Sequence, residues 1–441
     1  MQLTIKEICK ATGGTMQNST LDDLVKITGV SIDSRSDING KLFIPLVGGN
    51  SDGHDYINMA FKGGAVCALS ERKNVMGAVV KVKSTHRALT DLAIYARSMF
   101  KGPVVAITGS AGKTTTKDMI ASVLSQRFNT LKTAGNYNND IGLPLTLLRL
   151  EPEHQAMVLE MGMNHLGEIR ILSNIGEPNI CLITNIGDAH IENLGSREGI
   201  LKAKSEIFEG LQSGGTVILN GDDPLLTSLP NVPHATKTVY CKMEEASEIK
   251  NCGLRGSTCK IQGQIVEIPF PGDHMIMNAL MAFAVGRQLG LTTQEIAKGI
   301  KQFKPSGNRM EIRQVGGMTI VNDTYNASPP SVKAAIDMLK FESGRKVAIL
   351  GDMLELGEYA VDMHREIGEY AAKNLDCLIA IGTLSRHMHE ACKNSRYYEN
   401  KESFLREWQK ELRPGDTVLI KASRGMALEA VVNEIYDKCE M

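Results

Sequence analysis

The sequence predicts an α/β protein of three domains, in which two parallel sheets follow a smaller N-terminal unit. Its 441 residues suffice for about three domains, and 42% of them are hydrophobic, so cores of ordinary size can form. From residue 101 onward, short β-branched runs alternate with stretches of helical periodicity, which is typical of parallel sheets covered by helices. The segment Phe303–Met310 holds proline and glycine and predicts a linker. We therefore expect domains at residues 1–98, 99–310 and 311–441.

Charge and cysteine content exclude several classes of function. The formal net charge is −1, so no global attraction to nucleic acid or to an anionic membrane is expected. No apolar run approaches the ~18 residues that a membrane span needs. The charged N-terminus predicts an amphipathic helix rather than a signal peptide. Nine cysteines without Cys-x-x-Cys pairs predict reduced thiols and a cytoplasmic location.

The first hundred residues predict a small α/β domain. Its expected elements are strands at 30–35, 41–47 and 65–69 and a helix at 85–100. Polar loops at 33–35 and 48–56 follow the first two strands and could clasp a polar ligand, with Arg35 meeting a phosphate. Purely structural turns are the alternative interpretation of these loops.

A glycine loop at the start of the central domain predicts a nucleotide phosphate site. An apolar strand from Val104 leads into Gly109-Ser-Ala-Gly112-Lys113-Thr114, and a helical pattern follows. Backbone N–H groups and the positive helix end would face an anion, Lys113 would add a mobile charge, and Thr114 would offer a hydroxyl to Mg²⁺. The general phosphate-loop motif requires glycine where Ile107 stands, so the loop is shorter than that motif. We expect ATP or GTP to bind here.

Other strand ends of the central domain carry polar side chains. Strands are expected at 156–161, 180–185 and 216–220, which gives a mostly parallel sheet. Glu160, the segment 185–190 and the segment 220–223 follow them. Because the carboxyl ends of parallel strands meet at one edge, these groups should converge on one crevice with the Gly109 loop.

Three further features of the central domain carry polar side chains, and two of these features allow two interpretations each. The segment Asn136–Asp140 fits either a turn or an amide-rich substrate loop. Lys202 and Lys204 have helical spacing and by themselves indicate a solvated helix face. His274 and Asn278 share one face of another helix, where they fit either capping or an adenine contact.

The last 130 residues predict a Rossmann-like doubly wound domain. Its expected strands are at 319–321, 346–350, 377–381 and 417–421, with helices between them. The polar segment Asp323–Pro330 follows the first of these strands, and it would be separated from the Gly109 loop by the linker. A closing motion of the third domain toward the second is therefore expected when ligands bind.

Taken together, the motifs resemble the Mur ligases of peptidoglycan synthesis over essentially the whole chain. Each motif alone is modest evidence, but the ordered set is highly specific. The matching segments are Asp33–Arg35, Asp52–Tyr56, Gly109–Thr115, Asn136–Pro144, Glu160–Asn164, Thr184–His190, Ala203–Ile207, Gly307–Met310 and Asp323–Pro329. The last of these is the pattern of the dipeptide-adding step of the family. The shorter glycine loop also matches the family's own form.

The resemblance implies an ATP-dependent ligase with an acyl-phosphate intermediate. Its substrates would be UDP-N-acetylmuramoyl-tripeptide and D-alanyl-D-alanine, its N-terminal domain would bind the uridine nucleotide, and it would act with Mg²⁺ as a cytoplasmic monomer. The family also implies that CO₂ converts Lys204 to a carbamate. Alternatives are the ligase of the preceding step, a family member without ligase chemistry, and folate polyglutamylation. The third stem residue, lysine or diaminopimelate, is left open.

Residue roles follow from the same resemblance. The implied catalytic residues are Lys113, Glu160, His190, Lys204 and Arg309. The implied nucleotide contacts are Gly109, Ser110, Ala111, Gly112, Lys113, Thr114, Thr115, Asn278, Arg309, Asp323, Tyr325 and Asn326. The implied metal residues are Thr114, Glu160, His190 and Lys204, and the implied substrate contacts are Ile32, Ser34, Arg35, Gly49, Asn50, Ser51 and Asn138.

Overall fold

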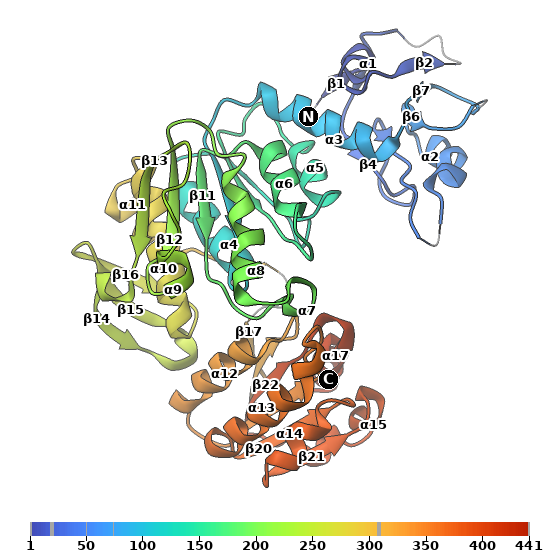
Figure 1. The fold of residues 1–441 in the computed structure, drawn as a ribbon. Coiled ribbons are helices and arrows are strands. Elements are labelled where there is room, and N and C mark those ends of the chain that lie inside the picture. The colour runs from blue at the N-terminus through green and yellow to red at the C-terminus, as the bar shows by residue number, and fades with distance from the viewer. Residues whose placement is uncertain (1, 18–21, 50, 74, 307–309, 440–441) are drawn as a thin grey trace.

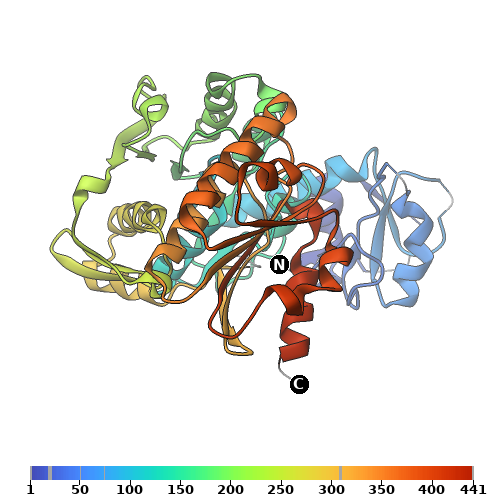
Figure 2. The ribbon, with the colours of Figure 1, turned by 90° about the horizontal axis from the view of Figure 1, so that it is seen from below.

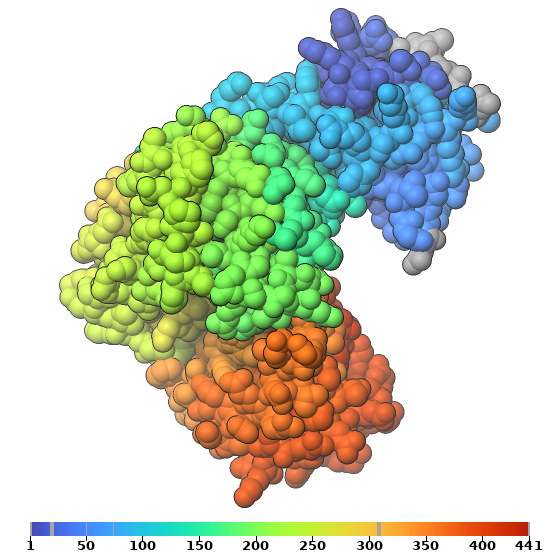
Figure 3. Space-filling model, in the orientation of Figure 1, coloured from blue at the N-terminus to red at the C-terminus, as the bar shows by residue number. Residues whose placement is uncertain are grey.

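The computed structural model describes residues 2–17, 22–49, 51–73, 75–306 and 310–439. Figure 1 shows three domains in chain order, with the central domain between the other two. The view from below in Figure 2 shows the N-terminal domain projecting to one side of the body formed by the other two. In Figure 3, a hollow separates the N-terminal domain from the C-terminal domain along one face of the central domain. The predicted three-domain α/β architecture is confirmed.

The N-terminal domain is built on a five-stranded sheet. The strand order is β2 (Thr15–Gln17), β7 (Val79–Lys81), β6 (Cys67–Ser70), β5 (Leu42–Phe43), β4 (Val30–Ser31), with only β2 antiparallel. A short ladder joins β1 (Leu3–Thr4) to β3 (Lys26–Ile27), and the helices are α1 (Ile5–Thr12), α2 (Ile57–Lys62) and α3 (Thr85–Met99). The strand predicted at 41–47 ends at Phe43, close to Pro45, which has no N–H for a ladder.

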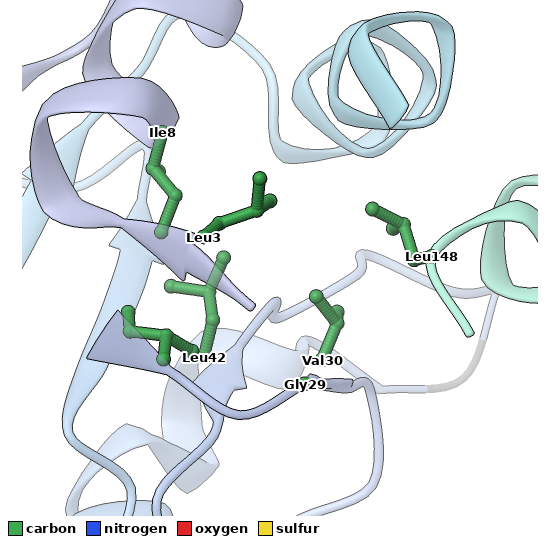
Figure 4. A pocket seen from close by; sticks show the side chains of 7 residues that line it. Leu3, Ile8, Gly29, Val30, Leu42 and Leu148 are labelled. Carbon is green, nitrogen blue, oxygen red and sulfur yellow. The ribbon is translucent and has the colours of Figure 1, made fainter. Parts of the chain in front are cut away.

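Apolar packing fixes the N-terminal domain against the central one. Leu148 of the central domain belongs to the same buried cluster as Leu3 and Leu42. Figure 4 shows these side chains facing one another across a seam that is too narrow for a water-sized sphere. The guanidinium of Arg97 in α3 also donates to the carbonyls of Gly176 and Glu177, each at 2.7 Å.

The central sheet is entirely parallel, as the alternation of strand and helix patterns predicts. Its order is β13 (Ala235–Cys241), β12 (Gly215–Asn220), β11 (Ile180–Ile183), β8 (Val104–Thr108), β10 (Ala156–Glu160), β9 (Thr130–Lys132). One face is covered by α4 (Lys113–Leu124), α10 (Asp273–Gln288) and α11 (Thr293–Lys301). The other is covered by α5 (Gly142–Leu147), α6 (Glu168–Gly176), α8 (Arg197–Ser205) and α9 (Pro224–Thr227), while α7 (Ile191–Leu194) lies beyond β11. The glycine loop thus sits at the middle of the sheet.

An antiparallel meander, which the sequence patterns did not predict, follows the central sheet. It consists of β14 (Ala246–Asn251), β15 (Ser257–Ile261) and β16 (Gln264–Ile268). Between β14 and β15, the turn at 253–255 places Leu254 among the buried residues of the C-terminal domain. The amide of Leu254 donates to Glu342 of that domain at 2.9 Å. The meander therefore forms a second connection between the two domains, besides the linker.

The C-terminal domain is the predicted doubly wound unit. Its sheet order is β17 (Glu311–Val315), β18 (Met318–Asp323), β22 (Thr417–Lys421), β19 (Lys346–Gly351), β20 (Cys377–Ile381), β21 (Ser395–Tyr398), and only β17 is antiparallel. One face packs on α12 (Pro329–Met338), α13 (Ala360–Asn374) and α14 (Arg386–Ala391). The other packs on α15 (Lys401–Leu405), α16 (Trp408–Glu411) and α17 (Glu429–Cys439).

Two predictions about the whole chain can be compared with the structure. Within the described ranges, none of the helices has the length and apolar character that a membrane crossing demands. All nine cysteines are free thiols, and no two of them form a disulfide.

Candidate active site

The glycine loop joins β8 to α4 and is shaped by contacts with the end of β11. Gly109 has φ of 152°, and a Cβ atom there would lie 1.8 Å from Oγ1 of Thr184. Gly112, at φ 79°, begins α4 in the left-handed region. The Thr184 hydroxyl donates to the carbonyl of Ala111 at 2.6 Å, and the Asn185 side chain accepts from the Ala111 amide at 2.9 Å. Glycine is therefore required where the loop approaches its neighbouring strand.

Side chains of the loop itself also point back onto it. The Ser110 hydroxyl accepts from the amide of Gly187 at 2.9 Å, which ties the loop to the segment before His190. The ammonium of Lys113 donates to the carbonyl of Gly109 at 2.6 Å. Sequence reasoning noted Asn185 only as a polar strand end, and its support of the loop became visible only in the fold.

Glu160 ends β10 beside the loop and is 2% exposed. Its Oε1 accepts from the Thr114 hydroxyl at 3.0 Å and from the Asn138 amide at 2.9 Å. Its Oε2 is buried and makes no hydrogen bond. Carboxylate and hydroxyl oxygens are the ligands that Mg²⁺ prefers, so Thr114 and Glu160 fit such an ion together with phosphate oxygens.

Lys117 is a fully buried cation beside Glu160 that sequence reasoning did not single out. Its Nζ lies 3.4 Å from Oδ1 of Asp118 and 3.7 Å from Oε2 of Glu160. Burial alone would raise the pKa of Asp118, but Lys117, Lys132 and Ser306 hold it below its ordinary value. The hydroxyl of Ser306 donates to Asp118 at 2.5 Å. The start of the linker is thereby fixed to α4.

The amines of Lys113 and Lys204 and the imidazole of His190 lie close enough to one another to interact electrostatically. Lys204 in α8 is 1% exposed, and burial, then the charge of Lys113, lowers its pKa well below the ordinary value. Within the described residues, no hydrogen bond or carboxylate contact is made by its ammonium. Burial, Lys113 and Lys204 lower the pKa of His190 to about 4, so its imidazole is neutral at pH 7. Lys202, two residues before Lys204, is exposed.

The two lysines of α8 therefore differ in their exposure to solvent. The prediction from spacing alone, which placed both on a solvated face, was wrong for Lys204. Helical periodicity located Lys204 on a helix, but the buried face of α8 is set by its contacts with the sheet. The resemblance to a family, rather than the pattern, pointed to Lys204.

On the other side of the loop lies Asn278 in α10, which is 5% exposed. Its Oδ1 accepts from the Thr116 hydroxyl at 3.1 Å and lies 3.4 Å from the position of a Cβ at Gly112. Its side-chain amide donates to the sulfur of Met275 in the same helix at 3.7 Å, and an adenine contact stays a prediction.

The predicted nucleotide residues of the C-terminal domain cluster at the end of β18. The ammonium of Lys421 bonds the carboxylate of Asp323 at 2.5 Å and the carbonyl of Asn326 at 2.8 Å. The guanidinium of Arg424 lies 5.8 Å from the ring centre of Tyr325. Lys421 and Arg424 come from β22 and its following turn, which explains why separate strand patterns did not reveal this cluster.

The predicted substrate loops of the N-terminal domain lie side by side at the ends of β4 and β5. Arg35 binds Asp33 through two hydrogen bonds of 2.9 and 3.0 Å, which lower the pKa of Asp33 to about 2. Ser34 donates to the sulfur of Met59 at 3.4 Å. Ile32 is half-buried, whereas Gly49 and Ser51 are exposed. Asn50 was predicted to contact the substrate in these loops, and Arg309 was predicted to contact the nucleotide phosphate. Both residues lie outside the described residues.

A metal cage built from protein side chains alone does not occur in the part of the chain that the structure describes. No three His, Cys, Asp or Glu side chains gather there in a way that could hold an ion.

Three features together define the class of this protein. They are a glycine loop on a parallel sheet, a buried carboxylate that accepts a hydrogen bond from the threonine of this loop, and a doubly wound domain joined through a linker. The chain belongs to the Mur ligase family. The Mur ligase middle domain matches residues 107–286, the Mur ligase glutamate ligase domain matches 308–424, and the Mur ligase family catalytic domain matches 26–96. The resemblance predicted from the motifs is thus confirmed.

Relatives with one particular name match over the full length. UDP-N-acetylmuramoyl-tripeptide–D-alanyl-D-alanine ligase from Bacillus subtilis is 38% identical over 98% of both chains, and the enzyme of that name from Haemophilus influenzae is 35% identical over 95% of both. Among solved structures, MurF from Acinetobacter baumannii has a TM-score of 0.91 and 31% identity over 99% of both chains. MurF from Thermotoga maritima in complex with ADP has a TM-score of 0.83 and 29% identity, over 95% of this chain and 99% of that one.

Proposed function

We propose that this protein joins D-alanyl-D-alanine to UDP-N-acetylmuramoyl-tripeptide with the hydrolysis of ATP. The observation that carries the proposal is the convergence of Lys113, Lys204 and His190 on one side of the glycine loop. Relatives of full length that bear the name of this ligase support the same reaction.

The reaction must bring two anions together. A carboxylate is a poor electrophile, so a carboxylate oxygen of the tripeptide first attacks the γ-phosphorus of ATP, and ADP leaves. The amino group of D-alanyl-D-alanine then attacks the acyl carbon, loses a proton as the amide forms, and releases phosphate. Cations and oriented N–H groups must neutralise the site before the first attack. Lys113 and the backbone of Gly109–Thr115 would do so at the β- and γ-phosphates.

Thr114 and Glu160 would hold Mg²⁺ through Oε2 of Glu160, which makes no hydrogen bond and lies 3.7 Å from the ammonium of Lys117. Mg²⁺, when bound, neutralises phosphate charge and fixes the orientation of the γ-phosphoryl group. His190 would face a second ion in the manner of the family. Asn138 donates to Glu160, and in this proposal it orients that carboxylate in addition to touching substrate.

Lys204 is suited to form a carbamate with CO₂. Its buried amine has a strongly lowered pKa and, in the described residues, no hydrogen-bonding partner, so burial favours the uncharged amine, which is the form that attacks CO₂. Addition of the amine nitrogen to CO₂ with loss of a proton gives an anionic oxygen pair. That pair would face the positive charge of Lys113, which now lowers the pKa of Lys204 by repulsion.

The remaining contacts would be divided among the three domains, with boundaries at 98/99 and 310/311. In the N-terminal domain, Ile32, Ser34, Arg35, Gly49, Asn50 and Ser51 would bind the uridine nucleotide. Asn278, Asp323, Tyr325 and Asn326 would contact adenine and ribose, and Arg309 would contact the γ-phosphate. We propose further that the protein acts as a monomer in the cytoplasm.

The test of this function measures phosphate release from ATP with UDP-N-acetylmuramoyl-tripeptide, with and without D-alanyl-D-alanine. We expect release to require the dipeptide and the product mass to increase by two alanyl residues. Release with UDP-N-acetylmuramoyl-dipeptide and a single amino acid, but not with the tripeptide and D-alanyl-D-alanine, would instead assign the chain to the preceding step of the pathway. If no phosphate is released with all three substrates present, the chain would instead be a family member that lacks ligase activity.

A further inference from the structure

Glu355 of the C-terminal domain reaches across the domain boundary to His190 of the central domain. Its Oε2 lies 3.5 Å from Nδ1 of the imidazole. Figure 1 shows α7, which begins directly after His190, at the border with the C-terminal domain. We propose that Glu355 is a positioning residue for His190, supplied by the C-terminal domain only when that domain packs against α7. The inference rests on the proposed function, since it gives His190 a place beside the phosphates.

The loop that carries Glu355 is held rigidly on both sides. Before it, the amide of Met353 donates to Nε2 of the buried His364 at 3.0 Å, and the amide of Leu354 donates to the Ser423 hydroxyl at 2.8 Å. After it, Leu356 is buried in the core of the domain. The backbone at Glu355 is therefore held by its neighbours on both sides, although the side chain is 68% exposed.

The same loop packs on α7. A Cβ atom at Gly357 would lie 3.5 Å from Cγ of Glu192, which is ordinary van der Waals contact. His190 precedes this helix, and Glu355 precedes Gly357 by two residues. The carboxylate and the imidazole thus lie next to a place where the Gly357 backbone packs beside the side chain of Glu192.

Both residues have a backbone conformation that side chains rarely adopt. His190 has φ of 67° and Glu355 has φ of 64°, and neither is glycine. Such conformations persist where the surroundings fix them, and they cluster at functional sites. Their occurrence on both sides of one interdomain contact is the observation that separates this pair from an ordinary surface contact.

A carboxylate beside Nδ1 has a defined effect on a neutral imidazole. It favours the tautomer that carries the proton on Nδ1 and orients the ring, which leaves the lone pair of Nε2 available to a ligand. Because the carboxylate belongs to another domain, the tautomer and orientation of His190 depend on the arrangement of the domains. The C-terminal domain thereby acts on the phosphate side of the site without a residue of its own entering it.

The experiment compares Glu355→Ala and Glu355→Gln with Glu358→Ala in the full chain. Glu358 is exposed on the same loop and forms no ion pair within the described residues, so it is the matched control. The protein is labelled with ¹⁵N-histidine, and the His190 ring signals are assigned by their loss in His190→Asn. We expect the wild type and Glu358→Ala to show the Nδ1–H tautomer at pH 7.5. Glu355→Ala should shift the ring nitrogens toward a mixture, and Glu355→Gln, whose amide oxygen can accept, should shift them less.

A second readout is the Mg²⁺ concentration for half-maximal phosphate release. Loss of a partner that orients a metal-site histidine weakens metal binding about 10-fold, so Glu355→Ala should raise this concentration by that order while Glu358→Ala leaves it unchanged. Identical His190 ring signals in Glu355→Ala and wild type would overturn the proposal. The ring signals need no ligase activity, so a failure of the proposed function would show separately as absent phosphate release in the wild type.

Discussion

The hydroxyl of Thr114, at the start of α4, lies 3.0 Å from Oε1 of Glu160, at the end of β10. This hydrogen bond joins the glycine loop to a carboxylate on the neighbouring strand before any ligand is present. The other oxygen of Glu160 makes no hydrogen bond although it is buried, which is unusual for a charged group. This oxygen lies 3.7 Å from the ammonium of Lys117, so the carboxylate oxygen without a hydrogen bond faces a buried cation beside the glycine loop.

Replacing Gly109 with alanine should strongly weaken nucleotide binding. The new Cβ would lie 1.8 Å from Oγ1 of Thr184 and 3.1 Å from its backbone nitrogen, and the Thr184 hydroxyl could turn away only by losing its hydrogen bond to Ala111. We expect the affinity for ADP, measured by calorimetry, to fall on the order of 100-fold, since preorganised backbone donors are lost. Gly29→Ala is the control, because its nearest neighbour would be 3.7 Å away. Unchanged ADP binding in Gly109→Ala would refute the role of the loop.

Replacing Lys204 with methionine should stop ligation and stabilise the fold. Burial lowers the pKa of Lys204 below 10.5, so the unfolded chain binds a proton that the folded chain does not, and stability decreases as pH falls below 10.5. Methionine removes this penalty. In CO₂-free buffer at pH 7, Lys204→Met should melt at a higher temperature than wild type, with phosphate release lowered by about 100-fold or more.

The matched control is Lys202→Met, because Lys202 is an exposed lysine on the same helix. This substitution should alter neither the melting temperature nor the rate of phosphate release. Normal turnover in Lys204→Met would remove the carbamate from the account. A lower melting temperature in Lys204→Met would contradict the lowered pKa.

His190 should make the fold sensitive to mild acid. Its pKa is about 4 in the folded chain, against 6.5 as the ordinary value, because of burial and the charges of Lys113 and Lys204. Between pH 6.5 and 4 the unfolded chain binds one more proton, so the free energy of unfolding falls as the pH is lowered through this window. The full contribution is about 3 kcal/mol.

Urea denaturation of wild type and His190→Asn at several pH values between 7 and 4.5 tests this effect. Asparagine suits the left-handed backbone at position 190, and His190→Asn should lose less stability on acidification than wild type. His234→Asn is the control, because His234 also has φ of 67° but is exposed. Parallel pH curves for wild type and His190→Asn would contradict the assignment.

Leu254 should contribute to the stability of a domain to which it does not belong in sequence. Its side chain is 7% exposed within the C-terminal core, so Leu254→Ala should destabilise that domain by about 2–3 kcal/mol. Trp408 is the single tryptophan of the chain and lies in this domain, so its fluorescence in urea reports the transition. Ile265→Ala, on an exposed position of the same meander, should leave the transition unchanged. Equal destabilisation by Leu254→Ala and Ile265→Ala would argue against a contribution of Leu254 to the stability of the C-terminal domain.

The sequence predicted those parts of the fold that depend on local patterns. The apolar run from Val104, the glycine loop and the helix after it have a fixed order that few other structures share. The meander at 246–268 was missed because β14 is exposed along nearly its whole length and lacks an apolar alternation. Likewise, Pro45 shortened a strand whose apolar residues alone suggested seven positions.

The candidate site was predictable in its position but not in its internal contacts. Strand ends indicated that Glu160 and the segment before His190 would converge with the loop. By contrast, the hydrogen bond from Asn138 to Glu160, the buried Lys117 and the contact of Lys421 with Asp323 join residues from separate elements. Such pairs depend on the tertiary packing of elements, which periodicity does not describe.

The most direct test of the account follows oxygen from the tripeptide to phosphate. UDP-N-acetylmuramoyl-tripeptide is prepared with ¹⁸O in its terminal carboxylate and is incubated with ATP, Mg²⁺ and D-alanyl-D-alanine. If the carboxylate attacks the γ-phosphorus in the cleft formed by Lys113, Glu160 and Lys204, each released phosphate will carry one ¹⁸O atom. Released phosphate without ¹⁸O would contradict the account, because the carboxylate would then not have been activated by phosphoryl transfer.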